Sequence, residues 1–287
     1  MEPQRSGSPT LDSKRQRLAG IIRDLGEVVV AFSGGTDSSY LLAACVDVLG
    51  AEHVLAITVD SPLLPRADLA MAQAVARALA ARHQVLAVDE LQTPEIRANP
   101  PDRCYHCKRQ RFLALQAIAE SVGGAQVVHG ENVDDHHDYR PGSVAARELG
   151  VRAPLAEAGL TKAEIRALSR ERGLPTWSLP AAACLASRVP YGTPLSAEAL
   201  RRIELAEEAL HVLLPDQQLR VRDHHPLARV ELELAGLSLA VQEPLRTRIC
   251  ARVRAAGYRY VTLDLDGYRM GSLNEEIVDR SQHGAGG

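Results

Sequence analysis

The sequence has no excess of basic residues and no apolar run long enough to cross a membrane. Its 287 residues include 33 Lys and Arg against 36 Asp and Glu, which gives a formal net charge of −3. This balance argues against a large nucleic-acid interface, because such an interface needs an excess of cations. No apolar stretch approaches the roughly 20 residues of a membrane-spanning helix. Residues 1–14 are polar and lack the apolar core of a signal peptide, so a cytoplasmic protein is expected.

Cysteine is also scarce, and the five cysteines are not spread as a disulfide framework would require. An odd number in local clusters favours metal binding or catalysis over disulfides. Cys104 and Cys107 form a Cys-x-x-Cys pair, which we expect in a loop because the preceding residues 99–102 contain two prolines. A redox disulfide or half of a zinc site is the alternative for this pair, and a small buried residue is the alternative for Cys184. Two further cysteines occur in apolar helical patterns and are expected in the core: Cys45 and Cys250.

Residues 28–39 carry the most informative pattern in the sequence. An apolar run over 28–32 predicts a strand, Ser-Gly-Gly follows it, and a helical pattern begins soon after. Strand, glycine turn and helix N-terminus form a geometry that binds phosphate. Glycines allow the backbone to approach an anion, and the first helical N–H groups have no partner within the helix. An ordinary strand–helix turn is the alternative. A Walker A loop is excluded, because no Gly-Lys-Ser/Thr follows.

The loop contains hydroxyl side chains and one carboxylate, which suit different parts of a magnesium–pyrophosphate ligand. Hydroxyl groups could donate to a pyrophosphate, and Asp37 could hold a magnesium ion on it. Asp37 and Ser38 are the expected catalytic members. The expected pyrophosphate-binding residues are Ser33, Gly34, Gly35, Thr36, Asp37, Ser38 and Ser39.

Strands alternate with helices through the first two thirds of the chain, which predicts a parallel sheet with right-handed crossovers. Apolar runs predict strands at 28–32, 54–59, 84–88 and 126–129, and helical patterns cover 11–25, 40–48, 65–81 and 112–122. Ligands of such sheets bind at the carboxyl ends of the strands. Polar residues at two further strand ends are therefore expected to join the loop around one nucleotide: Asp60, Ser61, Gly130, Asn132 and Asp135. A solvated loop is the alternative for the polar run 130–138.

A break at 190–194 precedes a smaller α/β segment. Ser196 is expected to cap a helix that runs through Leu213. A second helix is expected at 244–256, and strands at 219–221, 227–234 and 258–265. The expected domains are 14–192 and 193–276, between flexible tails at 1–13 and 277–287. Arg220 and Arg222 alternate on one strand face and together suit a phosphate, although a solvent-facing arginine ladder is the alternative.

Several stretches together make the chain similar to the LarE family. These ATP-dependent sulfur transferases of the PP-loop ATP pyrophosphatase superfamily make the nickel-pincer nucleotide cofactor of lactate racemase. The resemblance runs from about Leu18 to Asn274. It rests on residues 33–39, 102–108, 138–142, 148–155, 184–192 and 267–274. It implies a PP-loop (adenine nucleotide alpha hydrolase-like) α/β fold, with a parallel sheet flanked by helices and a smaller C-terminal α/β domain.

The resemblance also implies a reaction. ATP with Mg²⁺ would adenylate a carboxylate of a pyridinium biscarboxylic acid mononucleotide, and a sulfur nucleophile would displace AMP to leave a thiocarboxylate. In family members with a single active-site cysteine, the residue matching Cys184 gives up its own sulfur. This chain also carries Cys104 and Cys107, as does the three-cysteine branch, whose cysteines hold an iron–sulfur cluster. The expected metal ligands here are therefore Cys104, Cys107 and Cys184, holding a [4Fe-4S] cluster.

The remaining expectations concern the substrate and partners. The candidates for the substrate phosphate are Arg188, Arg220 and Arg222. The resemblance implies a small-molecule substrate and a homo-oligomer, with six subunits as the expected number, and it leaves the sulfur donor open.

Three other functions compete with this hypothesis. A PP-loop tRNA thiolase can also use three cysteines, but the net charge of −3 argues against it. An amide-forming ligase of the NAD synthetase type leaves the three cysteines unexplained. A non-enzymatic zinc or redox sensor would use a closed site of Cys104, His106, Cys107 and Cys184.

Overall fold

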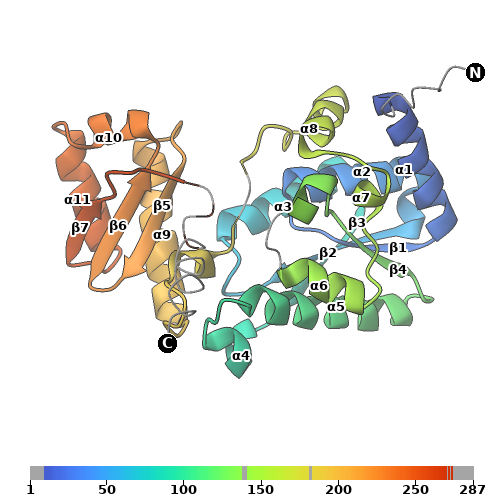
Figure 1. Ribbon diagram of the computed structural model, residues 1–287, viewed down its shortest axis with the longest axis horizontal. Helices are drawn as coiled ribbons and strands as arrows, with labels where there is room; N and C mark the ends of the chain where they lie inside the picture. The colour runs from blue at the N-terminus through green and yellow to red at the C-terminus, as the bar shows by residue number, and fades with distance from the viewer. Residues whose placement is uncertain (1–9, 138–140, 181–182, 270, 272, 274–287) are drawn as a thin grey trace, which may run out of the picture. The chain divides into compact units, whose positions relative to one another are not determined.

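The computed structural model describes residues 10–137, 141–180, 183–269, 271 and 273 (Figure 1). Residues 1–9 and 277–287 of the expected tails lie outside the described residues, as do residues 138–140, 270, 272 and 274 from the stretches that carry the family resemblance. The chain divides into two compact units. The first comprises Met1–Val88 and Cys104–Ala182, and the second comprises Asp89–Arg103 and Ala183–Gly287.

A four-stranded parallel sheet forms the centre of the first unit, which confirms the predicted α/β class. Its strands are β1 (Val28–Ala31), β2 (Val54–Asp60), β3 (Arg82–Ala87) and β4 (Gln126–His129). Their order is β3-β2-β1-β4, and Val28 of β1 aligns with Val54 on one side and Gln126 on the other. The valine-rich β1 is buried on both faces, as expected of an inner parallel strand.

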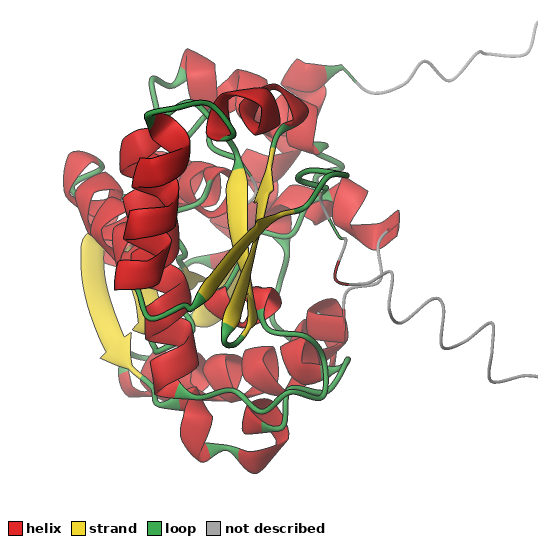
Figure 2. Ribbon diagram, turned by 90° about the vertical axis from the view of Figure 1, so that its left-hand side faces the viewer, coloured by secondary structure: helices red, strands yellow, loops and turns green. Residues whose placement is uncertain are grey.

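Helices cover both faces of this sheet (Figures 1 and 2). One layer contains α1 (Leu11–Leu25), α2 (Thr36–Leu49), α3 (Arg66–Ala78) and α8 (Lys162–Glu171), whose apolar residues share a core with Val28 and Val30. The opposite layer contains α5 (Arg103–Ser121) and α6 (Pro141–Glu148), which share a second core with Val29. Successive strand residues point to opposite faces, so one strand supplies both cores. Shorter segments are η1 (Ala51–His53), η3 (Val133–His137) and α7 (Pro154–Glu157).

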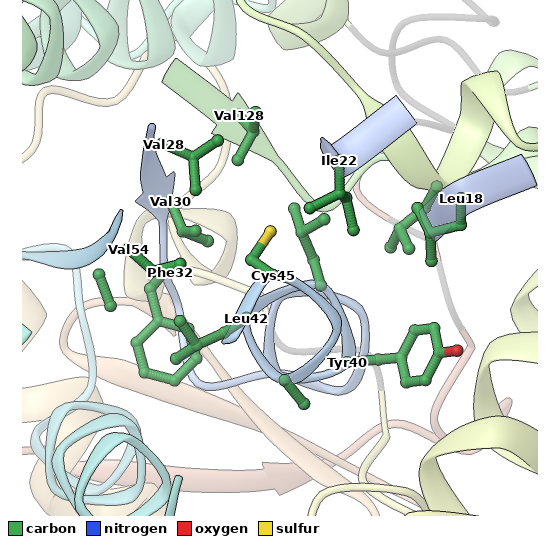
Figure 3. Packing of buried hydrophobic residues seen from close by; sticks show 14 of the residues in the cluster. Leu18, Ile22, Val28, Val30, Phe32, Tyr40, Leu42, Cys45, Val54 and Val128 are labelled. Atoms are coloured by element: carbon green, nitrogen blue, oxygen red, sulfur yellow. The ribbon is translucent and has the colours of Figure 1, made fainter. Parts of the chain in front are cut away.

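Helix α2 lies at the centre of the first core. Leu42 and Cys45 of α2 pack with Val28 and Val30 of β1 and with Ile22 of α1 (Figure 3). Burial raises the pKa of the Cys45 thiol to about 12, so Cys45 is a core residue as expected from the sequence. Within the described chain, no helix is long and apolar enough to cross a membrane.

The second unit contains a three-stranded sheet of order β5-β6-β7. Strand β5 (Leu219–His224) is antiparallel to β6 (Leu227–Leu232), and β6 is parallel to β7 (Tyr260–Leu263). Its core also contains residues of α9 (Ala197–Leu213), α10 (Leu234–Ala240) and α11 (Leu245–Ala255). Ser196 caps α9 as predicted, whereas α10 begins where a longer strand was expected. The unit also holds η2 (Glu90–Gln92), α4 (Pro94–Arg97) and η4 (Leu185–Arg188).

Asn99 ties the segment 89–103 to the rest of the second unit. It is fully buried and has a left-handed backbone with φ of 55°. Its side-chain amide donates to the carbonyl oxygens of Val189, Pro190 and Thr193, at 3.3, 2.9 and 3.1 Å. Arg103 is also buried and donates to the Asn99 side chain and, at 3.2 Å, to the carbonyl oxygen of Ala186.

Candidate nucleotide-binding site

The turn between β1 and α2 has the geometry that the sequence predicts. Gly35 is the N-cap of α2 and provides no side-chain hydrogen bond to the first turn. Gly34 has a φ of 77°, and a Cβ atom there would lie 2.8 Å from the backbone of Ala72, so only glycine fits. The hydroxyl oxygens of Ser33 and Ser38 lie 3.0 Å apart and close the turn on itself. The first N–H groups of α2, which have no partner within the helix, therefore follow a tight glycine turn, and this arrangement suits an anion.

The side chains of two of the seven predicted loop residues are buried. The hydroxyl of Thr36 is buried and donates to the carbonyl oxygen of Thr176 at 2.7 Å. Ser39 is fully buried within α2. Both positions therefore face the packed side of the helix.

The loop after β4 lies directly against the first turn of α2. A Cβ atom on Gly130 would lie 2.9 Å from the amide nitrogen of Ser38 and 3.1 Å from the carbonyl carbon of Asp37. The loop is held by its own side chains. The Asn132 backbone N–H donates to Asp135 at 3.0 Å, and the Asp134 N–H donates to Asn132 at 2.9 Å. The structure thus brings together two of the three predicted strand ends.

Asp37 forms an ion pair that the sequence did not predict. The ammonium of Lys162, the first residue of α8, donates to Asp37 Oδ2 at 2.6 Å. The backbone N–H of Lys162 donates to Asp134 at 2.8 Å. Lys162 therefore contacts both loops of the candidate site. The capping sequence Thr-Lys-Ala-Glu at 161–164 is a recognisable helix start, and could have located this residue.

The end of β2 is held by arginine side chains. Arg66 pairs with Asp60 at 2.5 Å and also donates to the carbonyl oxygen of Ser61. Arg111 of α5 donates to the Ser61 hydroxyl at 3.3 Å. Asp60 and Ser61 are thus at the carboxyl edge of the sheet, as predicted, and both are engaged with cations.

His129 is a buried residue at the end of β4 that sequence reasoning missed. Its Nε2 lies 3.5 Å from a carboxylate oxygen of Glu131, and its ring contacts the edge of Phe112. Burial, and secondarily the positive charge of Lys108, lower the pKa of His129 to about 3. The imidazole is therefore neutral at physiological pH, and its strand position beside Gly130 places it next to the candidate site.

The Cys-x-x-Cys pair is not in a loop, so this part of the sequence-based prediction is wrong. Cys104 and Cys107 lie in the first two turns of α5, which begins at Arg103, two residues after the second proline. Prolines end a preceding element but are compatible with the start of a helix, which explains the error. Residues three apart share one helix face, so the two half-buried thiols can act on one ligand. His106 lies between them in sequence, and its ring contacts Tyr105.

Cys184 lies in the second unit, directly before η4, and is half-buried. Within the described parts of the chain, no three His, Cys, Asp or Glu side chains form a group that could hold a metal ion. Cys250 is half-buried on α11, and is thus less enclosed than Cys45.

The predicted phosphate-binding arginines are surrounded by acidic groups. Arg188 forms a two-point ion pair with Glu207 at 2.8 and 2.9 Å, and Arg222 forms one with Glu231 at 2.7 and 2.8 Å. All four side chains are buried. The alternative prediction of a solvent-facing arginine ladder is therefore wrong for Arg222.

Arg220 differs from these two arginines. Its guanidinium lies over the ring of Tyr268, 5.2 Å from the centroid, and donates to the carbonyl oxygen of Leu219. Burial, and secondarily the charge of Arg188, lower the pKa of Arg220. Among the described residues, Arg220 forms no ion pair with a carboxylate. Arg229 also contacts Glu231 at 3.4 Å and is balanced by Asp264 at 3.5 Å. The four arginines and three carboxylates of this group therefore carry one excess positive charge, which suits an anion.

Comparison with known proteins places this geometry in a family context. The family model for NAD synthase matches residues 20–123, which include the β1–α2 turn. An uncharacterized protein of Synechocystis sp. is 40% identical over 268 residues, 93% of this chain and 99% of that protein. The pyridinium-3,5-bisthiocarboxylic acid mononucleotide synthase of Lactiplantibacillus plantarum is 37% identical over 270 residues, 94% of this chain and 96% of that protein. An argininosuccinate synthase of Natronomonas pharaonis is 31% identical over 164 residues, 53% of this chain and 40% of that protein.

The buried His129 predicts a specific loss of stability in acid. Its folded-state pKa of about 3 is below the unfolded value of about 6.5. The unfolded state therefore binds a proton first, and stability that is present above pH 6.5 is lost as the pH falls toward 3. The His129 imidazole alone should lower the free energy of unfolding by about 2 kcal/mol at pH 5. We expect urea unfolding at pH 7.5 and pH 5 to show that His129→Gln removes this part of the pH dependence. The exposed His53→Gln variant is the control, and equal acid sensitivity of wild type and His129→Gln would contradict the prediction.

Proposed function

The chain belongs to the family of the pyridinium-3,5-bisthiocarboxylic acid mononucleotide synthases, and on this premise we propose which reaction it performs and with which residues. It is an ATP-dependent enzyme with the PP-loop fold. We infer that it adenylates carboxylates of a pyridinium biscarboxylic acid mononucleotide and converts them to thiocarboxylates, releasing AMP and pyrophosphate. We propose that the enzyme is a homo-oligomer of the cytoplasm. Its substrate is a small molecule, and it has no nucleic-acid or membrane partner.

The observation that carries this proposal is the turn at residues 33–39. A glycine turn at the N-terminus of α2 offers backbone N–H groups to a pyrophosphate, and the Gly130 loop lies against the same turn. A carboxylate is a poor electrophile. Transfer of AMP to it creates a good leaving group, and the loop would stabilise the pyrophosphate that departs. The identity to the synthase of Lactiplantibacillus plantarum over 94% of this chain supports the same chemistry.

Carboxylates near this turn suit a magnesium ion, because hard cations prefer oxygen ligands. Asp37 is on the first turn of α2, and Asp135 belongs to the adjoining loop. We propose that these two residues would hold Mg²⁺, which would supply charge neutralisation for the triphosphate.

Asp37 provides the test of the adenylation step. Asp37→Asn keeps the size of the side chain and removes its charge. We expect it to lower the rate of pyrophosphate release from ATP and the dicarboxylate substrate by roughly 10²–10³, or about 2.7–4 kcal/mol, the usual loss for one such electrostatic contact. Asp47→Asn is the matched control, because Asp47 is on the same helix and pairs with Arg172 on the surface. A folded Asp37→Asn protein with wild-type turnover would refute the assignment.

The second proposed subsite is the arginine cluster around β5. We propose that Arg220 binds the phosphate of the mononucleotide substrate, with Arg188 and Arg222 adding positive potential from their ion pairs. The support is the half-buried Arg220 guanidinium, which stacks on Tyr268 beside two arginines already neutralised by Glu207 and Glu231.

Replacement of Arg220 by lysine tests this subsite. Lysine keeps the charge but lacks the planar fork and the stacking surface. We expect Arg220→Lys to weaken binding of the mononucleotide by about tenfold, the lower end for a charged hydrogen bond, and to leave ATP affinity unchanged. Arg259→Lys is the control, since Arg259 also stacks on a tyrosine of the same unit. Equal losses of ATP and substrate affinity would assign Arg220 to the fold or to the ATP site.

The sulfur source is the third part of the proposal. We propose that Cys104, Cys107 and Cys184 are the ligands of a [4Fe-4S] cluster. The support is the presence of three cysteines where the single-cysteine members have one, and the shared helix face of Cys104 and Cys107. Such a cluster normally takes four thiolates, so three would leave one iron able to carry a replaceable sulfide. Among the described residues, no three metal-ligating side chains lie close enough together to hold a metal ion.

Anaerobic purification tests the cluster. We expect a brown protein that contains iron and acid-labile sulfide, and we expect the chromophore to disappear in Cys104→Ala, Cys107→Ala and Cys184→Ala. Cys45→Ala and Cys250→Ala are the controls and should keep it, because these thiols lie on α2 and α11. A colourless anaerobic protein with stoichiometric zinc would reject the cluster. Conversion of Cys184 to dehydroalanine after one turnover would instead show that its own sulfur is transferred.

A further inference from the structure

A cavity of about 300 Å³ lies between α1, α2 and α8, all within the first unit. Each of these three helices contributes to its apolar walls, which include Leu18, Ala19, Ile22, Ala43, Ala44 and Leu168. The short alanine side chains of α1 and α2 explain the space, because longer side chains at these positions would fill it. Small-molecule sites in proteins begin at about this volume and are lined mainly by apolar residues.

Tyr40 brings a polar group to this cavity. Its side chain leaves α2 on the side opposite Val30 of β1 and lines the cavity (Figure 3). Tyr40 is only 7% exposed, and its hydroxyl has no hydrogen-bond partner among the described residues. Burial raises the pKa of Tyr40, so the phenol is neutral at physiological pH and can both donate and accept a hydrogen bond. A polar group in such surroundings is stabilised by any ligand that pairs with it.

The charged residues that line the cavity are already paired with one another. Arg15 pairs with Glu171 at 3.0 Å, and Arg172 forms a two-point pair with Asp47 at 2.9 and 3.0 Å. These four side chains are between 47% and 65% exposed, whereas the apolar walls and Tyr40 are largely buried. Two cations and two carboxylates cancel, so the cavity favours neither an anion nor a cation. A neutral ligand is therefore the best match.

We propose that this cavity binds a small neutral molecule with an apolar body and a single hydrogen-bonding group that pairs with Tyr40. A cavity of about 150 Å³ is sufficient for benzene, so this one suits a molecule of two fused rings. Burial of apolar surface would supply most of the affinity, and the Tyr40 hydroxyl would orient the ligand. The site is separate from the β1–α2 turn, although Tyr40 follows the turn residues 33–39 directly on α2. Such a site is independent of the proposed reaction.

Indole and indene test the site, because the two molecules share one shape and only indole carries an N–H group. Both would be titrated calorimetrically into wild type, Tyr40→Phe, Ala44→Leu and Ala251→Leu. We expect wild type to bind both with a Kd of about 1 mM or lower. Tyr40→Phe should fold normally, because its hydroxyl has no partner among the described residues. It should bind indole about 2- to 12-fold more weakly, the usual range for one neutral hydrogen bond, and bind indene as wild type does.

A substitution that fills the cavity shows where the ligands bind. Ala44→Leu should abolish binding of both molecules, because its side chain occupies the space from α2. Ala251→Leu is the matched control, since Ala251 is exposed on α11 in the second unit, and it should leave both affinities unchanged. Thermal unfolding would verify that each variant is folded, and Ala19→Leu replaces Ala44→Leu if the latter does not fold. Failure of wild type to bind either molecule, wild-type affinity in the filled variant, or equal changes for indole and indene in Tyr40→Phe would overturn the proposal.

Discussion

The close approach of two backbone segments at the carboxyl edge of the parallel sheet is the constraint on which the candidate site depends. Gly130 lies so near the first turn of α2 that a side chain at this position would collide with Ser38. Gly34 lies equally close to Ala72 of α3. Because β1 is hydrogen-bonded to both β2 and β4, the sheet brings the loops after these strands to one edge. Glycine then lets their backbones meet beside the first N–H groups of α2, which have no partner within the helix.

Local patterns were sufficient to predict much of the first unit. Alternation of valine-rich strands with helices predicted the parallel sheet, and the Ser-Gly-Gly turn predicted the N-terminus of α2. The sequence could not show that Lys162 pairs with Asp37, because 125 residues separate them and only the tertiary fold joins them. The Cys-x-x-Cys segment was misassigned for a different reason. Prolines are typical of loops, but they also occur just before helices, as they do before α5.

The arginines of the second unit show a limit of reasoning from strand periodicity. Alternation correctly placed Arg220 and Arg222 two residues apart on β5. It could not show that Arg222 is matched by Glu231 from the next strand, or that Glu207 of α9 satisfies Arg188. A buried arginine is costly unless it is paired, so these carboxylates are the condition for having three guanidiniums in one small region. Because Glu207 and Glu231 neutralise Arg188 and Arg222, Arg220 is the arginine of these three whose charge suits an anionic ligand.

The contacts of Asn99 have a consequence for how the chain can be divided experimentally. The polypeptide enters the second unit at Asp89, leaves it after Arg103 and returns at Ala183. A fragment starting at residue 183 would lack the amide that satisfies three carbonyl groups of the 189–193 segment, and unsatisfied buried carbonyls are destabilising. Neither unit is a contiguous piece of sequence, so a cut at any single peptide bond cannot yield both intact. Synthesis must therefore have passed Thr193 before Asn99, in the early segment 89–103, can form its final hydrogen bonds.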